Sequence, residues 1–189
     1  MENHKIRVAI TQGDTNGVGL ELIFKTFADQ EMFDLCTPIV YASPKVASYH
    51  SNALETQCQF SIINNAKDAR DGRVNLVPCF EEEVKVELGV ATAEAATAGV
   101  KALDKALADR HNGVYDVLVC GPMNGGEVRL GTMTFPCTTR FIETSLGEGA
   151  QAEVIHMNSI MRVALASNSC LKDITLTQDV IEHKVRVLH

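Results

Sequence analysis

The sequence predicts an α/β protein with three layers, in which a mostly parallel sheet is covered by helices on both faces. Short apolar runs rich in β-branched residues alternate with stretches whose apolar residues have helical spacing. This alternation favours parallel pairing, because the crossover between two parallel strands is usually a helix. Glycine-rich turns follow two of the apolar runs, at 13–19 and 121–126. Ligands bind sheets of this kind at the carboxyl ends of the strands, so both turns lie where a site is expected.

The first strand and the first helix are expected on either side of the first glycine turn. Residues 7–11 form the apolar, β-branched run. After the turn, the apolar residues with helical spacing are Leu20, Ile23, Phe24 and Phe27. We therefore predict a strand, a tight turn and a helix in direct succession.

The turn contains Gly13, Asp14, Asn16, Gly17 and Gly19. Their spacing is neither the G-x-G-x-x-G fingerprint nor a P-loop, since no Lys-Ser or Lys-Thr follows. Two interpretations stay open. These five residues are a candidate ligand loop, because backbone N–H groups at the start of a helix can hold an anion. Alternatively, the glycines shape the turn for packing, and the two polar side chains stabilise it through their own backbone.

The later elements follow in the same alternating order. Strands are expected at residues 38–42, 60–63, 74–77, 84–88, 114–120, 154–157 and 162–166, with 84–88 half-exposed and 114–120 buried. Helices are expected from Pro44 toward Leu54, at 91–107, after the turn in 134–142, and from Thr175 onward. Ser43 is a candidate N-cap before Pro44, and Thr175 with Gln178 has the spacing of a capping box.

Composition indicates one ordinary globular domain. The chain has 189 residues, of which 46% are hydrophobic and 22% charged, and its formal net charge is −7. The acidic balance and the lack of a basic cluster argue against nucleic-acid binding. No apolar run reaches the roughly 18 residues of a membrane span, and residues 1–5 lack the apolar core of a signal peptide. We expect a cytoplasmic protein without a membrane partner.

The cysteines and histidines show no metal-binding spacing. None of the six cysteines forms a C-x-x-C pair, and no two of the six histidines share a short ligand spacing. The cysteines are expected to be mostly buried thiols. Cys137 and Cys170 have no neighbouring base and are poor nucleophile candidates. His156 lies in an apolar run and is expected to be a hydrogen-bonded core histidine.

Several ordered motifs resemble those of the 4-hydroxythreonine-4-phosphate dehydrogenase family. Residues 13–21 resemble its G-D-P-x-G-[IV]-G-x-E signature, with Thr15 in place of proline. Residues 42–47 are similar to G-S-P-K-V-A, and residues 116–125 to D-V-L-V-T-A-P-I-N-K. Residues 135–141 lie where the family has F-P-G-H-T-E-Y, and residues 162–174 where it has R-V-A-L-x-T-x-H-x-P-L-K-D-I.

The resemblance implies an isocitrate/isopropylmalate dehydrogenase-like fold in truncated form. It implies that residues 1–189 are a single α/β domain corresponding to the N-terminal part of the family, with the second domain absent. It also implies the family's reaction, in which NAD oxidises a secondary alcohol and CO2 is then lost, during pyridoxal phosphate biosynthesis. A divalent metal (Zn, Mg or Co), held by imidazole ligands, acts as Lewis acid in that reaction.

The departures from the family motifs fall on the chemistry. Thr138 lies where a histidine contacts substrate, Gly125 where the family has a lysine, and residues 167–170 contain no metal-binding histidine. We therefore assign no catalytic residue and no metal ligand. Thr138 and Thr139 are the candidate substrate-binding residues, with helix capping as the alternative. Arg140 either clamps a phosphate or carboxylate or lies exposed on a helix.

Two functions from different classes stay open. The first is an oxidoreductase of this family, inactive as these 189 residues alone. The second is a non-catalytic α/β domain that binds a phosphorylated small molecule or a partner chain. NAD and the metal are expected for the family rather than for this stretch of it. The family is homodimeric, and a chain without the later half is expected to expose apolar surface and to self-associate.

Overall fold

The computed structural model describes residues 5–56, 58–124, 128–147, 149–150, 152 and 154–164, together with 182, 185 and 186. The chain divides into two compact units, Met1–Gly125 and Gly126–His189. Each unit is described by itself.

The first unit is built on a parallel five-stranded sheet with the strand order β3-β4-β2-β1-β5. The strands are β1 (Ile6–Thr11), β2 (Cys36–Ala42), β3 (Phe60–Ile62), β4 (Val74–Pro78) and β5 (Val117–Val119). β1 pairs with β2 from Ile6↔Cys36 to Thr11↔Tyr41, and its other edge pairs with β5. β1 therefore lies between β2 and β5 in the sheet.

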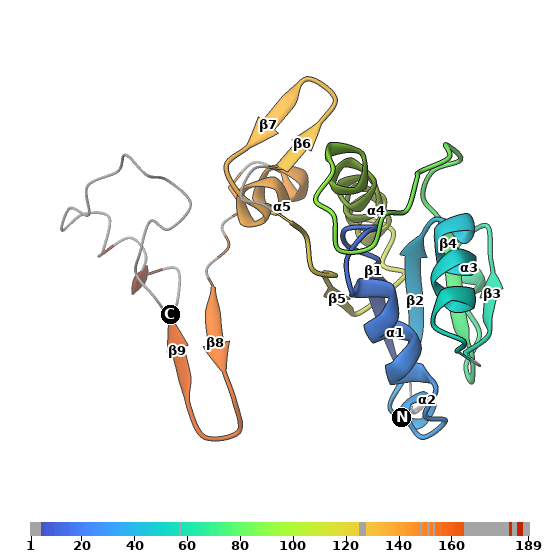
Figure 1. The fold of residues 1–189 in the computed structure, drawn as a ribbon. Helices are drawn as coiled ribbons and strands as arrows, with labels where there is room; N and C mark the ends of the chain where they lie inside the picture. Colours follow the sequence, from blue (N-terminus) through green and yellow to red (C-terminus); the bar gives the residue numbers. More distant parts are fainter. Residues whose placement is uncertain are drawn as a thin grey trace. The chain divides into compact units, whose positions relative to one another are not determined.

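Helices cover both faces of this sheet (Figure 1). The helices are α1 (Gly19–Phe27), α2 (Met32–Leu35), α3 (Pro44–Ala53), the 3-10 helix η1 (Ala66–Asp68) and α4 (Ala93–Arg110). One core cluster packs α1, α2 and α3 against the sheet, with Phe24, Phe33 and Val46 among its buried residues. A second cluster, with Tyr41 and Ala106, lies between the sheet and α4. The predicted three-layer α/β architecture is confirmed.

Helix α1 forms where its apolar spacing predicts. Leu20, Ile23, Phe24 and Phe27 are all buried, as expected of one face of an amphipathic helix. Glu21 and Lys25 pair across one turn on the exposed face. Ser43 is the N-cap residue of α3, as predicted, but its side chain makes no capping hydrogen bond.

The second unit contains two antiparallel hairpins and one helix within its described residues. The elements are β6 (Val128–Leu130), β7 (Met133–Phe135), α5 (Thr138–Leu146), β8 (Ile155–Met157) and β9 (Arg162–Ala164). Phe135 and Phe141 pack edge to face at 5.1 Å and join α5 to the first hairpin. The strands β8 and β9 and the helix α5 match predicted elements, whereas the hairpin β6–β7 was not predicted. Of the predicted last helix only residues 182, 185 and 186 are described, and these three are helical.

Three expectations about single segments are wrong. β5 is not buried: Val117 and Val119 are 48% and 46% exposed, because among the described strands β5 pairs only with β1 and lies at the sheet edge. Residues 84–88 form a loop and not a strand. Its Glu87 N–H donates to a side chain, the Asn16 carboxamide, and not to a strand. His156 is exposed in β8 and is not a core residue, since a two-stranded hairpin buries little of its own surface.

In the described part of the chain, no helix is both long enough and apolar enough to cross a membrane.

The start of α4 packs on the end of β1 through a glycine. A Cβ added at Gly99 would lie 2.7 Å from the carbonyl oxygen of Gly13 and 2.9 Å from its carbonyl carbon. Both atoms belong to the backbone, so the contact can be relieved only by moving α4 or the turn. A glycine here brings the helix against the carboxyl end of the sheet.

We predict that Gly99→Ala destabilises the protein by about 1–2 kcal/mol. Helix propensity alone favours alanine by about 1 kcal/mol, but overpacking against a fixed backbone costs roughly 1–3 kcal/mol. Urea unfolding measures the change. Thr97→Ala, on the exposed face of the same helix, is the control and should not destabilise. A more stable Gly99→Ala protein would contradict the close contact.

A buried tyrosine on the other face gives the stability a pH dependence. The Tyr41 hydroxyl donates to Asp109 Oδ2 at 3.0 Å. Burial, and next the charge of Asp109, raise the pKa of Tyr41 above its ordinary value of 10.0. Burial also raises the pKa of Tyr115 to about 12. The folded state thus favours neutral phenols, and this stabilisation is complete below the unfolded pKa and declines as the pH rises above it.

We expect the free energy of unfolding to fall between about pH 9 and about pH 12. In Tyr41→Phe the slope of this fall should be smaller than in wild type, by up to about 1.4 kcal/mol per pH unit. Urea unfolding across this range measures both slopes. Tyr49→Phe is the matched control, because Tyr49 is 47% exposed. Equal slopes in wild type and Tyr41→Phe would show that Tyr41 ionises as easily in the folded state.

Candidate functional site

The glycine turn joins the carboxyl ends of β1 and β5. Gly13 has a positive φ of 72°, which favours glycine. The N–H of Asp14 donates to the carbonyl of Pro122 at 2.9 Å. The N–H of Gly121 donates to Thr11 Oγ1 at 3.0 Å. The segments that follow the two strands are therefore hydrogen-bonded to each other, in the position predicted for a ligand edge.

Glycine is required in this turn for space as well as for conformation. A Cβ at Gly13 would overlap the carbonyl of Pro122, one at Gly121 would overlap Thr11, and one at Gly19 would overlap Gln12. All of these are backbone atoms. Gly17 is different, since its Cβ would lie 3.3 Å from the nearest atom, the Asp14 carbonyl oxygen. The packing interpretation thus explains three glycines and leaves Gly17 without a strict requirement.

The Asp14 side chain stabilises the turn through its own backbone, as one interpretation predicted, whereas the Asn16 side chain does not. Asp14 Oδ1 accepts from the N–H of Asn16 at 2.8 Å, and the carbonyl of Asp14 accepts from the N–H of Gly17 at 3.0 Å. Both side chains are buried. The Asn16 carboxamide points away from the turn's own backbone and binds the segment that precedes α4.

These bonds limit what the turn can offer a ligand. The N–H groups of Asp14, Asn16 and Gly17 already have acceptors. The first α-helical bond of α1 runs from Leu22 N–H to the carbonyl of Val18, so the N–H groups of the first turn have no partner within the helix itself. An anion can therefore be held only at the start of α1, on the side where Gly17 and Val18 reach the surface.

Two buried polar atoms beside the turn have no hydrogen-bond partner in the described part of the structure, Gln12 Nε2 and Thr15 Oγ1. The other amide atom of Gln12, Oε1, accepts from the N–H of Ser43 at 3.0 Å. His50 Nε2 lies 2.8 Å from the carbonyl oxygen of Thr15. Sequence reasoning noted Thr15 only as a departure from the family signature and did not single out Gln12 or His50, because nothing in their spacing distinguishes them from ordinary residues.

Thr138 and Thr139 are the first two residues of α5, in the second unit. Cys137 is the N-cap, and no side chain caps this helix, so the capping alternative for the two threonines is wrong. Both are half-buried. Arg140 is exposed on the helix and forms a 2.5 Å ion pair with the less exposed Glu143, which agrees with the exposed alternative. The structure brings the two threonines together and leaves their predicted role in substrate binding as a prediction.

The described residues do not bring metal-ligating side chains together into a metal centre. No group of three His, Cys, Asp or Glu side chains lies close enough together there to hold an ion. Gly125 and residues 167–170, where the family motifs have a lysine and a histidine, lie outside the described part of the chain. Cys120, beside the second glycine turn, is exposed and not one of the expected buried thiols. Desolvation by the atoms around it raises the pKa of its thiol, which disfavours the nucleophilic thiolate.

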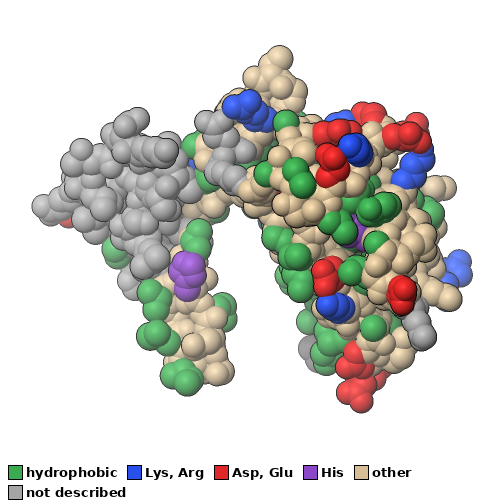
Figure 2. Space-filling view, in the orientation of Figure 1, with side chains coloured by type: hydrophobic (Ala, Val, Ile, Leu, Met, Phe, Trp, Pro, Cys, Tyr) green, Lys and Arg blue, Asp and Glu red, His purple; other side chains and the backbone are tan. Residues whose placement is uncertain are grey.

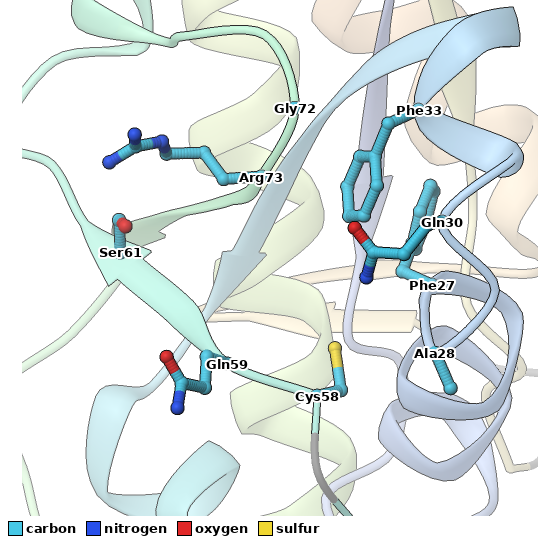
Figure 3. A pocket seen from close by; sticks show the side chains of 9 residues that line it. All are labelled: Phe27, Ala28, Gln30, Phe33, Cys58, Gln59, Ser61, Gly72 and Arg73. Carbon is cyan, nitrogen blue, oxygen red and sulfur yellow. The ribbon is translucent and has the colours of Figure 1, made fainter.

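A separate cavity of about 520 Å³ opens at the opposite edge of the sheet, where β3 and β4 begin. Figure 3 shows the Cys58 thiol pointing into it between β3 and α1. Phe27 and Phe33 form its apolar wall, and the guanidinium of Arg73 is turned away from them. This cavity has the size of a ligand pocket but no convergent polar groups, and it is distant in the fold from the glycine turn.

Comparison with known proteins agrees with this geometry. The chain is 43% identical to a 4-hydroxythreonine-4-phosphate dehydrogenase of Bacteroides thetaiotaomicron over 192 residues, a match that covers 100% of this chain and 53% of that protein. The chain thus spans about half the length of that relative.

Solved structures of enzymes with the same name share the fold. The structure from Burkholderia phymatum superposes with a TM-score of 0.75 at 21% identity, over 87% of this chain and 50% of that one. The structure from Klebsiella pneumoniae gives a TM-score of 0.54 at 21% identity, over 64% of this chain and 38% of that one. A family model described as pyridoxal phosphate biosynthetic protein PdxA matches residues 34–189. Because this match covers most of the chain, the protein belongs to the PdxA family.

Proposed function

We propose that this chain supplies part of a 4-hydroxythreonine-4-phosphate dehydrogenase, the enzyme that oxidises and decarboxylates a phosphorylated hydroxy amino acid in pyridoxal phosphate biosynthesis. These 189 residues alone bind a phosphate-bearing small molecule weakly and do not turn it over. The observation that carries the proposal is the 43% identity to a dehydrogenase of that name along the whole chain.

The site supports binding more than catalysis. The start of α1 presents N–H groups that need no particular side chain to hold an anion. Three N–H groups of the preceding turn are occupied by the protein itself, so few donors remain and the affinity is low. Thr138 stands in the motif position where the family has a substrate-contacting histidine, and threonine cannot take a proton as imidazole does.

The described residues do not fit the two cofactors of the family. A divalent metal would supply Lewis-acid stabilisation, but no cluster of ligands is present among them. NAD would accept the hydride, but the turn lacks the dinucleotide fingerprint, and the N–H groups of Asp14 and Asn16 are not free for a pyrophosphate. We therefore derive no chemical step from this part of the chain, and assign NAD and the metal to the complete enzyme.

We also propose that the protein forms a homo-oligomer, as in the family, and that it is cytoplasmic. Apolar side chains at the sheet edge support the homo-oligomer, since Val117 and Val119 pair with Val8 and Ile10 of β1 and remain half exposed. Exposed apolar patches of more than a few hundred Å² mark interaction surfaces.

The first test of the proposal is ligand binding followed by NMR. We expect the amide resonances of Gly17, Val18 and Gly19 to shift with inorganic phosphate or 4-phosphohydroxythreonine at about millimolar concentration, because few donors remain at the start of α1. Gly17→Val should abolish the shifts, because Val18 and Gly17 form the accessible side of the turn. Circular dichroism must show that this variant folds.

In the same samples with NAD, the absorbance of NADH should not rise above a control without protein. Unmoved resonances throughout residues 13–19 would end the binding proposal. Accumulation of NADH would instead show that catalysis persists in these residues, and would leave the family assignment intact.

A second test concerns the metal. We predict no one-to-one binding of zinc, manganese or magnesium tighter than about micromolar, because imidazole ligands with suitable spacing are missing. Isothermal titration calorimetry measures this. Binding that is lost on changing a small set of His or Asp residues would reveal a site that the sequence and the described residues do not indicate.

A further inference from the structure

The segment between β4 and α4, residues 80–92, crosses the carboxyl end of the sheet, and we call it the strap. It contains no helix or strand until Thr92, which is the N-cap of α4. Figure 1 shows it as the green connection from β4 to α4. We propose that Asn16 of the glycine turn latches this strap in place, so that the strap opens locally when the hydrogen bonds of this one residue are released.

Asn16 binds the strap with every polar atom of its side chain. Its Oδ1 accepts from the N–H of Glu87 at 2.8 Å. Its Nδ2 donates to the carbonyl of Val90 at 2.9 Å and to Thr92 Oγ1 at 3.2 Å. The main-chain carbonyl of Asn16 adds a fourth bond, from the N–H of Gly89 at 2.9 Å. Residues 84–88 have no neighbouring strand, and the hydrogen bonds of one buried residue hold this end of the strap instead.

The other polar fastenings of the strap are exposed. Glu83 pairs with Lys45 of α3 at 2.6 Å, and Glu82 pairs with Lys101 of α4 at 2.6 Å. In Figure 2, acidic and basic side chains gather at the upper right of the view. Exposed ion pairs contribute little to stability, because water and salt screen them. The bonds of Asn16 are shielded from water and are correspondingly stronger.

Apolar contacts hold the middle of the strap but not the end beside the turn. Val84 and Val86 pack against the core cluster under α1 and α3. Leu88 and Val90, which flank the residue bound to the Asn16 carbonyl, are 50% and 52% exposed. Without Asn16, this end of the strap has few contacts to keep it closed, so opening is a local event and does not require unfolding of the sheet.

Amide hydrogen exchange followed by NMR tests the latch. In Asn16→Ala and in Asn16→Asp, the amides of Glu87 and Gly89 should exchange about tenfold faster or more, because a buried hydrogen-bond set is lost or turned repulsive. Asn16→Asp keeps the size of the side chain, so faster exchange in this variant cannot come from the empty space that a smaller side chain would leave. The amides of Ala9 and Ile39, fully buried in the sheet, should keep their protection and report that the variants are folded.

Asn65→Ala is the control, since the side chain of this asparagine also accepts from a backbone N–H, that of Lys67 at 2.9 Å, but lies far from the strap in the chain. It should leave the exchange of Glu87 and Gly89 unchanged. If these amides exchange at the wild-type rate in both Asn16 variants while the sheet stays protected, the latch is refuted.

Discussion

The close approach of backbones around Gly13 is the constraint on which the first unit depends. Here the end of β1, the segment after β5 and the start of α4 meet with no room for side chains. Gly99 lies against the Gly13 carbonyl, and Gly13 itself lies against Pro122. The two core clusters lie on opposite faces of the sheet, so neither can fix the carboxyl edge by itself. Hydrogen bonds from Asp14 and Gly121 then hold the two strand ends together. Apolar burial favours a compact fold without direction, whereas this steric fit specifies one arrangement of strand ends and helix.

The same constraint limits the chemistry of the turn. Tight packing uses the N–H groups that an open glycine loop would present to a phosphate, and it buries Asp14 and Asn16 under the strap. A dinucleotide-binding turn differs, since its backbone N–H groups face the ligand. In this protein the turn mainly connects the strand ends, and the backbone N–H groups that remain as donors lie at the start of α1. Binding and packing interpretations of the glycines are therefore not exclusive, because they concern different N–H groups of one short segment.

Sequence periodicity predicted the fold because the core obeys it. Leu20, Ile23, Phe24 and Phe27 define one helical face, and that face is buried. Prediction from periodicity failed where the position of a strand in the sheet decides its exposure. Residues 114–120 have the composition of a buried strand, but an edge position leaves Val117 half exposed. Residues 84–88 alternate as a strand would, yet a single carboxamide 71 residues away in sequence binds their backbone. Such long-range side-chain bonds leave no periodic signal. The candidate turn was found through its glycines, whereas Gln12, Thr15 and Gly99 gained their significance only from their neighbours in space.

These physical requirements explain which positions keep the residue of the family motifs and which depart from it. Positions such as Gly13 and Gly19 are fixed by backbone contact, and any side chain there would displace the strand ends, whether or not a substrate is bound. Thr138 occupies a position where the family motif has a histidine, and the resemblance implies a chemical demand there, whereas the helix start accommodates threonine. A scaffold residue and a substrate-contacting residue are thus under different constraints: the first is set by folding, and the second by the reaction. Membership of the family can therefore be read from the turn and the sheet, while activity has to be argued from side chains such as Thr138 and from the ligands available to a metal.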